Sequence, residues 1–352
     1  MHSCILQLMK SKRIVTALAS FGMSGRVFHA PFLERSEDYE LKLILERSKA
    51  LSSVKYPDTA IIRSFQEIVE DYEVTLVIVN TPTYLHYQMC KQALLAGKNV
   101  VVEKPFTSTV AEGEELISIA KDKGLILTVY HNKRLEGDMK TVKKLIENGS
   151  FGELKSFKLA LHRFRPDLGP KKWKEEKNPG AGLLYDIGSH MIDIALQFFG
   201  KPESINADLQ IQRSGGQVVD YFSIDMNYDG FIVNLFSDML TEEILPSLVV
   251  EGSKGRFVKY GHDPQEVNLS KEVIGWNDLG LDNPANYGSL VSVGSGISEV
   301  IKTKNGSYVD FYCNLAKIIR GDANLLVTAE EGLEVVKVIE ELSLKFPIQS
   351  SK

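Results

Sequence analysis

Short apolar runs alternate with helix-like patterns along the first third of the chain. Five runs have this character, at residues 13–19, 41–45, 74–79, 99–102 and 125–130. A β-strand that is covered by helices on both faces needs such a nearly continuous apolar sequence. Because strands alternate with helices, right-handed crossovers follow, and the pattern predicts an α/β fold with a parallel, doubly wound sheet.

The segments between these runs carry the signals of helices and of their ends. Leu85, Met89 and Ala93 recur every four residues and form one apolar stripe, and Gly97 follows as a C-terminal cap. Residues 109–112 read Thr-Val-Ala-Glu. This is a capping box, and it predicts the start of another helix.

The pattern changes after about residue 130. Residues 222–228 alternate apolar and polar side chains, and Asp229-Gly230 separates them from another apolar run. Asp-Gly between two such runs favours a β-hairpin, because both turn residues need positive φ angles. We therefore expect mainly antiparallel strands here, a loop-rich stretch over residues 261–296, and a final amphipathic helix over residues 329–344.

The same change divides the chain into two domains. We expect an α/β domain over residues 10–130 and an α+β domain over residues 131–352, the second with a large, mainly antiparallel open sheet. A length of 352 residues is sufficient for two separate cores. A sheet with one face free of helices would invite contacts between copies, so a homo-oligomer, either dimer or tetramer, is expected.

Composition makes several classes of function improbable. Lys and Arg number 41 and Asp and Glu 46, a net charge of −5, so neither nucleic acid nor an anionic membrane is an expected partner. No apolar run approaches the length of a membrane span, and the run at residues 4–9 is too short for a secretory signal. Cys4, Cys90 and Cys313 form no paired motif for a disulfide framework or a zinc site. We expect a cytoplasmic protein with no metal.

The first apolar run leads into a glycine-rich turn, which reads Ser20-Phe21-Gly22-Met23-Ser24-Gly25. Glycines at this place allow a tight turn and a close approach of the backbone to the pyrophosphate of a dinucleotide. Gly22 and Gly25 match the second and third glycines of that motif, and Ser20 replaces the first. The alternative is an ordinary strand–helix turn. We expect the five residues from Phe21 to Gly25 to bind a dinucleotide.

The second apolar run ends at Glu46-Arg47-Ser48, where the adenosine ribose of a dinucleotide would lie. An acid at this place favours the free 2′-hydroxyl of NAD, whereas Arg and Ser favour the 2′-phosphate of NADP. Both kinds of residue are present, and a solvated charged loop is a further alternative. Because Arg47 and Ser48 occur together, we expect NADP, with NAD as the second choice.

The run at residues 74–79 ends at Asn80-Thr81-Pro82. Loops at the carboxyl ends of parallel strands hold the ligands of such sheets, so we expect these three residues at the cofactor. His86 follows one turn into the next helix and is grouped with them, although a structural role is the more ordinary interpretation of a lone helix histidine.

Two further segments carry groups suited to chemistry. Residues 103–105 read Glu-Lys-Pro and follow a buried strand, so Lys104 is expected at the carboxyl edge of the sheet. Residues 180–193 read as a loop that opens into a helix, where Asp186 and His190 are four apart and share one face. Each also has an ordinary interpretation, as an exposed lysine, a helix-start acid or a structural histidine.

Together these motifs resemble the glucose–fructose oxidoreductase, inositol dehydrogenase and rhizopine catabolism (Gfo/Idh/MocA) family. Glu103-Lys104-Pro105 and the spaced run Asp186, His190 and Asp193 carry the resemblance, which extends from about residue 13 to the C-terminal helix. It implies a Rossmann dinucleotide-binding domain followed by a substrate-binding and oligomerisation domain. It also implies that Lys104, Asp186 and His190 are the catalytic group, with Glu103 and Lys104 beside the cofactor.

Within that family, five segments look like those of the NADP-dependent scyllo-inositol dehydrogenases, at residues 22–32, 130–134, 163–166, 172–174 and 184–190. The resemblance implies hydride transfer between a nicotinamide and a secondary alcohol or ketone of a cyclic polyol or sugar. Two alternatives remain. One is a reductase of another carbonyl, such as an aldose, a dihydrodiol or a tetrapyrrole, and the other is a non-catalytic dinucleotide sensor.

Oxidation of a secondary alcohol needs a proton acceptor besides the hydride acceptor. His190 suits the base, because an imidazole has an ordinary pKa of about 6.5. Asp186 would orient that imidazole or hold a neighbouring substrate hydroxyl, and Lys104 would donate to the developing alkoxide. The resemblance adds Asn132 at the domain junction beside the cofactor, and Arg163, Arg165, Trp173 and Tyr312 at the substrate, with surface or core-packing roles as the alternatives.

Overall fold

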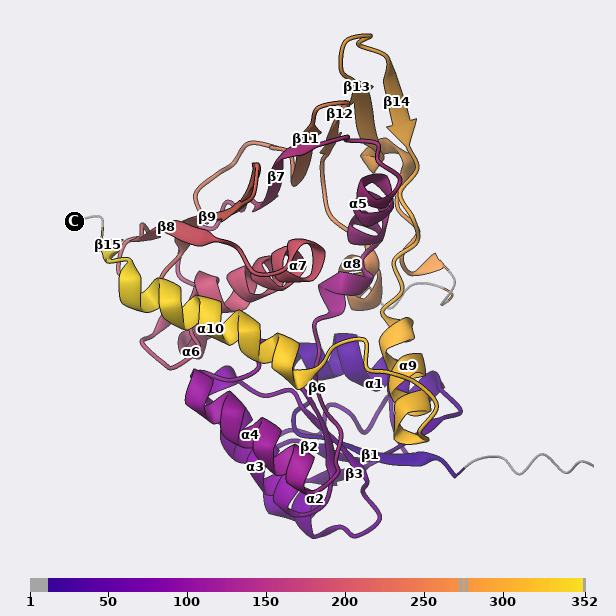
Figure 1. Cartoon of the computed structure of the whole chain (residues 1–352). Helices are drawn as coiled ribbons and strands as arrows, with labels where there is room; N and C mark the ends of the chain where they lie inside the picture. Colours follow the sequence, from indigo (N-terminus) through magenta and orange to yellow (C-terminus); the bar gives the residue numbers. More distant parts are fainter. Residues whose placement is uncertain (1–11, 272–274, 276–277, 351–352) are drawn as a thin grey trace, which may run out of the picture.

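The computed structural model of the protein describes residues 12–271, 275 and 278–350. Cys4 and the first residues of the expected N-terminal domain lie outside this part. Two sheets organise the described chain, one in each half of the molecule (Figure 1). Among the described residues, no helix is long and apolar enough to cross a membrane.

The first sheet has six strands in the order β3-β2-β1-β4-β5-β6, and every neighbouring pair is parallel. The strands are β1 (Ile14–Leu18), β2 (Tyr39–Leu45), β3 (Ala60–Ile62), β4 (Leu76–Val79), β5 (Asn99–Val102) and β6 (Leu127–Val129). The helices between them are α1 (Ala30–Arg35), α2 (Phe65–Glu70), α3 (His86–Leu95) and α4 (Val110–Asp122). The predicted doubly wound parallel sheet is confirmed.

Local sequence explains two of these elements directly. All four residues of β4 are buried, as a strand between two helix layers requires. Helix α4 begins with the predicted capping box, in which the Thr109 hydroxyl accepts from the Glu112 backbone N–H at 3.3 Å. The Glu112 carboxylate in turn accepts from the Thr109 N–H at 3.2 Å.

The second sheet has nine strands in the order β14-β13-β12-β11-β7-β10-β9-β8-β15. Its strands are β7 (Leu154–Leu161), β8 (Ser204–Ile211), β9 (Tyr221–Tyr228), β10 (Phe231–Ser237), β11 (Leu248–Gly252), β12 (Gly255–Lys259), β13 (Gly288–Ser292), β14 (Ser298–Ile301) and β15 (Ile348–Ser350). Only β10–β7 and β15–β8 are parallel pairs among them, so the sheet is mainly antiparallel, as predicted. The predicted hairpin joins β9 to β10, with Gly230 at a φ of 78°.

Among its described residues, the stretch over residues 261–296 is mostly loop, as expected, but it is not loop throughout. This stretch contains α8 (Gln265–Ser270) and β13, which pairs with β12 and β14. Gly288 is the first residue of β13, and the position needs glycine because an added Cβ would come within 2.1 Å of the Phe257 ring. Strand formation here depends on pairing with distant neighbours, which a local pattern does not show.

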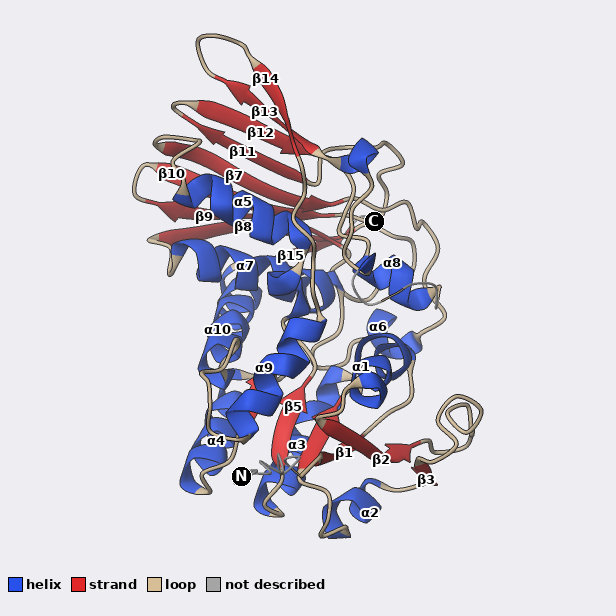
Figure 2. Cartoon of the chain, turned by 90° about the vertical axis from the view of Figure 1, so that its right-hand side faces the viewer, coloured by secondary structure: helices blue, strands red, loops and turns tan. Residues whose placement is uncertain are grey.

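Helices cover one face of the second sheet (Figure 2). They are α5 (Gly137–Glu147), α7 (Ser189–Phe199) and the second half of α10 (Ala329–Lys345), and they share a core with the strands. The strand residues between these core positions, such as Asn234 and Phe236 of β10, point to the other face and are half-buried.

The end of the chain returns to the first sheet. Helix α9 (Val309–Ile319) and the residue before it place Tyr308, Phe311, Tyr312 and Leu315 in the core of the N-terminal sheet. Helix α10 contributes to both cores, with Leu333 and its neighbours in the first and Leu342 and its neighbours in the second. Figure 1 shows α10 running from the second sheet to the first half.

Candidate active site

The glycine-rich turn after β1 is closed by Ser20, the residue that stands in place of the usual first glycine. The Ser20 hydroxyl accepts a hydrogen bond from the Gly22 backbone N–H at 3.2 Å. Asn80, at the end of β4, donates from its side chain to the Ser20 carbonyl at 2.8 Å. The turn is therefore held by its own residues and by the neighbouring strand.

Gly22 and Gly25 differ in the atoms that a side chain at each position would meet. An added Cβ at Gly25 would lie 2.4 Å from the Ser20 carbonyl oxygen and 2.9 Å from the Asn80 amide, so the chain's own packing requires that glycine. An added Cβ at Gly22 would meet only the Ser20 hydroxyl, at 3.4 Å. Gly22 is exposed, and its missing side chain leaves open surface beside the turn.

The loop after β2 contains a buried acidic residue, Glu46, and an exposed basic residue, Arg47. Glu46 is buried, and its carboxylate accepts from the Leu51 N–H at 2.8 Å and from the Ser52 N–H and hydroxyl at 2.9 and 2.6 Å. Burial opposes ionisation of Glu46, but the Ser52 and Leu51 hydrogen bonds outweigh it and hold the pKa of this carboxyl below its usual value. The carboxylate therefore serves its own loop, whereas Arg47 is exposed.

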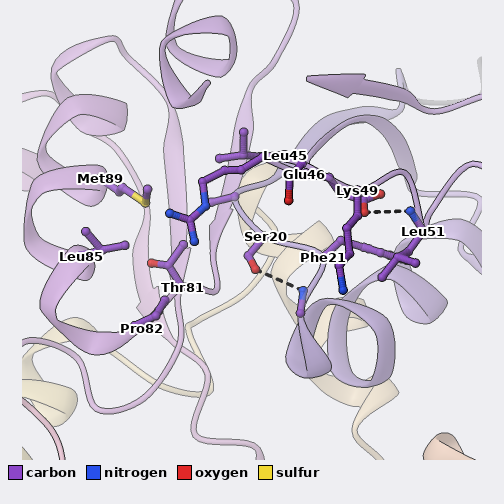
Figure 3. A pocket seen from close by; sticks show the side chains of 14 residues that line it. Ser20, Phe21, Leu45, Glu46, Lys49, Leu51, Thr81, Pro82, Leu85 and Met89 are labelled. Carbon is purple, nitrogen blue, oxygen red and sulfur yellow. Dashed lines mark hydrogen bonds between the residues drawn. The ribbon is translucent and has the colours of Figure 1, made fainter. Parts of the chain in front are cut away.

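These segments meet in one pocket (Figure 3). Its walls come from the glycine turn, the loop after β2, the loop after β4 and the start of α3. The lining residues are Ala19, Ser20, Phe21, Gly22, Leu45, Glu46, Arg47, Ser48, Lys49, Leu51, Thr81, Pro82, Leu85 and Met89. Figure 3 shows Thr81 and Pro82 on one side of Ser20 and Phe21, with Lys49 and Leu51 on the other.

Eight residues expected at the cofactor are not part of this pocket's wall: Met23, Ser24, Gly25, Asn80, His86, Glu103, Lys104 and Asn132. The Ser24 hydroxyl donates to the Asn80 carbonyl at 3.4 Å, and Met23 is exposed next to Gly22. His86 is buried, with its ring nitrogens 3.0 Å from the Pro105 carbonyl oxygen and 2.9 Å from that of Thr81. Its ring therefore holds two loops together.

Lys104 and Asp186 meet at the carboxyl edge of the first sheet. The Lys104 ammonium donates to the Asp186 carboxylate at 3.0 Å and to the Asp186 carbonyl at 2.6 Å. The other carboxylate oxygen accepts from Lys174 at 2.8 Å. Burial alone would raise the pKa of Asp186, but the two ammonium groups outweigh it and hold that pKa well below its usual value.

Asp186 and His190 lie in one continuous helical segment. Residues Leu184–Gly188 form a π-helical turn that continues into α7. Asp186 lies in that turn and His190 in the first turn of α7. In the described part of the chain the Asp186 carboxylate accepts from Lys104 and Lys174, and no hydrogen bond joins it to the His190 ring.

His190 is buried, and its Nδ1 atom has no hydrogen-bond partner in the described part of the chain. Burial, followed by the positive charges of Lys104 and Lys133, lowers its pKa well below the usual 6.5. The imidazole is therefore neutral near pH 7. His131 lies close by, with its ring centroid 6.4 Å from that of His190.

A second pocket adjoins His190, between α7 and the second sheet. Besides His190, its polar lining residues are Lys133, Glu136, Asp138, Ser247 and His262. Lys133 donates to Glu136 at 2.7 Å, and the buried Tyr308 hydroxyl donates to the same carboxylate at 3.0 Å. This polar lining places hydrogen-bonding groups next to the imidazole.

Asp193, the last residue of the spaced motif, has a structural position. Arg134 donates to both of its carboxylate oxygens, at 2.8 and 2.5 Å. Both side chains are buried, so this bidentate pair fixes α7 to the segment that follows β6. The third residue of the motif thus holds the helix that carries the other two.

The remaining expected residues are divided among several places. Asn132 is buried directly after β6, at the junction of the two halves. Arg163 is half-buried just after β7, where burial and then the Arg165 charge lower its pKa. Arg165 itself is exposed. Trp173 is half-buried in the short helix α6 (Lys172–Glu175), near the Lys174–Asp186 pair.

Tyr312 lies in the first core instead of closing a substrate pocket. It is 1% exposed, and its hydroxyl is 2.5 Å from His29 Nδ1. His29 Nε2 is 2.9 Å from the carboxylate of Glu103, whose other oxygen accepts from the Lys104 backbone N–H at 3.2 Å. Glu103 and Tyr312 are therefore joined through His29 and support the Lys104 loop from inside.

Sequence reasoning did not single out Lys174, Lys133 or His29. Each stands in a segment that carried the family resemblance, which is the signal that could have found them. Among the described residues, no group of three or more His, Cys, Asp and Glu side chains is arranged to hold a metal ion.

Comparison with protein families accounts for most of the chain. Residues 16–131 match the NAD-binding Rossmann fold of the Gfo/Idh/MocA oxidoreductase family, and residues 143–345 match the C-terminal alpha/beta domain of the same family.

Individual relatives are similar over nearly the whole length. The scyllo-inositol 2-dehydrogenase (NADP(+)) IolW of Bacillus subtilis is 37% identical over 96% of both chains. The solved structure of yvaA from B. subtilis has a TM-score of 0.88 at 36% identity, covering 94% of this chain and 96% of that one. A Bacteroides fragilis structure has a TM-score of 0.84 at 41% identity, with the same coverage.

Proposed function

The chain belongs to the Gfo/Idh/MocA family of oxidoreductases, and from that premise we propose that it is an NADP-dependent dehydrogenase of a cyclic polyol or sugar, with scyllo-inositol as the leading substrate. The observation that carries this proposal is the convergence of Lys104, Asp186 and His190 between the two halves. The name of the B. subtilis relative supports the substrate and the cofactor.

The pocket after β1 fits a dinucleotide. The packing of the chain itself does not require a glycine at position 22. The open surface that Gly22 leaves suits the close approach of a pyrophosphate. Arg47, Ser48 and Lys49 line the pocket, while the Glu46 carboxylate is already hydrogen-bonded within its loop. This division favours a ribose that carries a 2′-phosphate, and it supports NADP over NAD.

The residues between the halves would do the acid–base work. A bound nicotinamide supplies the hydride chemistry. His190, neutral because its pKa is lowered, takes the proton from the substrate hydroxyl. The Lys104 ammonium stabilises the oxygen as charge develops on it, and Asp186, held ionised by two lysines, accepts from a neighbouring substrate hydroxyl.

The pH dependence of the reaction tests the assignment of the base. An imidazole accepts a proton only in its neutral form. Activity therefore falls only when the pH drops through the lowered pKa of His190. We expect kcat/KM for alcohol oxidation to stay constant from neutral pH to below pH 6.5, the ordinary imidazole value. A pH–rate profile with an acid limb at or above pH 6.5 would contradict the assignment.

Arg47→Ala should weaken NADP much more than NAD. If Arg47 pairs with the 2′-phosphate, its loss removes a charge-assisted contact that only NADP makes, and we expect about a 10- to 100-fold rise in the Kd of NADP. Fluorescence titration with NADPH and NADH measures both. The exposed Arg26 is the matched control, since it is not part of the pocket wall. Equal losses for the two cofactors would refute the assignment.

A spectrophotometric screen at 340 nm tests the function as a whole, with NADP and NAD against inositol isomers, common sugars and their ketones. We expect turnover with NADP and a cyclic polyol, scyllo-inositol first. Turnover confined to other carbonyl compounds would show that the substrate is not a cyclic polyol. Cofactor binding without turnover on any compound would instead favour a dinucleotide sensor.

We also propose that the protein is a cytoplasmic homo-oligomer, a dimer or tetramer that associates through the second sheet. The half-buried residues on its outer face, such as Phe236, support this arrangement. Light scattering coupled to size exclusion gives the oligomeric state.

A further inference from the structure

Lys174 is a cation that the general mechanism does not require. Its ammonium lies 2.8 Å from one oxygen of Asp186, while Lys104 occupies the other oxygen. The side chains of Lys174 and Asp186 are 34% and 33% exposed, so this pair is open to solvent. Lys104, at 14%, lies deeper. Lys174 therefore lies on the solvent side of the carboxylate, and Lys104 lies on its buried side.

The segment around Lys174 is anchored by buried charges. The neighbouring Glu175 accepts from Arg213 at 2.7 Å and from the Gly169 N–H at 3.0 Å. Arg213 also donates to Asp220 at 3.0 Å, and the side chains of Arg213 and Asp220 are only 5% and 1% exposed. This network ties the short helix α6 to the connection between β8 and β9, and it holds Lys174 in place over Asp186.

We propose that Lys174 is a specificity-determining residue, which together with Asp186 recognises the hydroxyl groups next to the reacting carbon of the substrate. The inference rests on the proposed function and names a feature of its substrate, a vicinal diol or an α-hydroxy ketone.

The chemistry of the pair matches this feature. A carboxylate accepts hydrogen bonds and an ammonium donates three, of which Asp186 takes one from Lys174. Two gauche oxygens on adjacent carbons are about as far apart as the two partners of a hydrogen bond. Such oxygens can therefore contact Lys174 and Asp186 together, one accepting and the other donating. A substrate without the neighbouring hydroxyl would leave the remaining N–H groups of Lys174 and the remaining lone pairs of Asp186 without a hydrogen-bond partner from the substrate.

The test uses the reduction direction, because a ketone fixes which carbon reacts. The probes are the 2-ketone of scyllo-inositol and an analogue that lacks the hydroxyls on both carbons beside the carbonyl. The variants are Lys174→Met, which removes the charge, and Lys174→Arg, which keeps it. Lys172→Met is the matched control, because Lys172 is an exposed lysine of the same short helix. Both kcat and KM are measured with NADPH for each ketone.

We expect the wild type to prefer the hydroxylated ketone, and Lys174→Met to shrink that preference in kcat/KM by about 10- to 100-fold, the effect of one lost hydrogen bond to a charged group. Lys174→Arg should retain most of the preference, and Lys172→Met all of it. An equal loss for both ketones in Lys174→Met, or no loss for either, would overturn the inference. Failure of the wild type to reduce either ketone would contradict the proposed function itself, and the inference with it.

Discussion

Replacement of His190 by alanine should lower kcat by about 10²–10⁴-fold while NADPH still binds, which is the range for loss of a general base. The imidazole is buried, its pKa is lowered, and its Nδ1 atom has no partner in the described part of the chain. A buried polar atom without a partner is unfavourable for stability, and a role in proton transfer gives His190 a reason to be at this position.

The measurement combines steady-state kinetics at 340 nm with a fluorescence titration of NADPH. His190 is absent from the wall of the glycine-turn pocket, so the Kd of NADPH should change little. Thermal unfolding checks that the variant is folded. Near-normal turnover by a folded His190→Ala protein would remove this residue from the mechanism.

Lys104→Met should have a comparable effect, a loss of about 10²–10³-fold in kcat, the usual cost of removing a donor from a developing oxyanion. Methionine keeps most of the length of the side chain and removes its charge. The substitution also removes a positive charge beside both Asp186 and His190, so the pKa of each group should rise. The acid limb of the pH profile should therefore lie at a higher pH in the variant than in the wild type.

The control for Lys104→Met is Lys123→Met, an exposed lysine of the same domain at the end of α4. It should match the wild type in kcat, KM and thermal stability. Retained activity in Lys104→Met would show that the ammonium is not needed for turnover, and Asp186 and His190 would have to account for the chemistry alone.

Sequence pattern was sufficient for the elements whose signal is local. The runs that became β1, β4 and β5 are continuous and apolar, and the capping box at residues 109–112 starts α4 as predicted. Strand β13 was missed because its residues are only partly apolar and it depends on pairing with β12 and β14.

The candidate site shows the same limit. Residues 103–105 and 186–190 carry a pattern that sequence alone can detect. The contact between Lys174 and Asp186, which are 12 positions apart, depends on the path of the loop between them. The ion pair between Glu175 and Arg213 joins this segment to the connection between β8 and β9, 38 positions away. The burial of Tyr312 depends on the return of α9 to the first core. None of these contacts follows from spacing along the chain.

The return of the last helices also bears on how the protein is made. The ribosome releases the six strands of the first sheet long before α9, whose Phe311, Tyr312 and Leu315 belong to the core of that sheet. Domains generally fold during synthesis in order from the N-terminus, at about 5–20 residues per second. Here the N-terminal half must wait for the C-terminal helices to cover part of its apolar surface. During that interval of about ten seconds or more, we expect the exposed apolar surface of the nascent chain to bind chaperones. For the same reason, truncation before α9 should yield an aggregation-prone fragment.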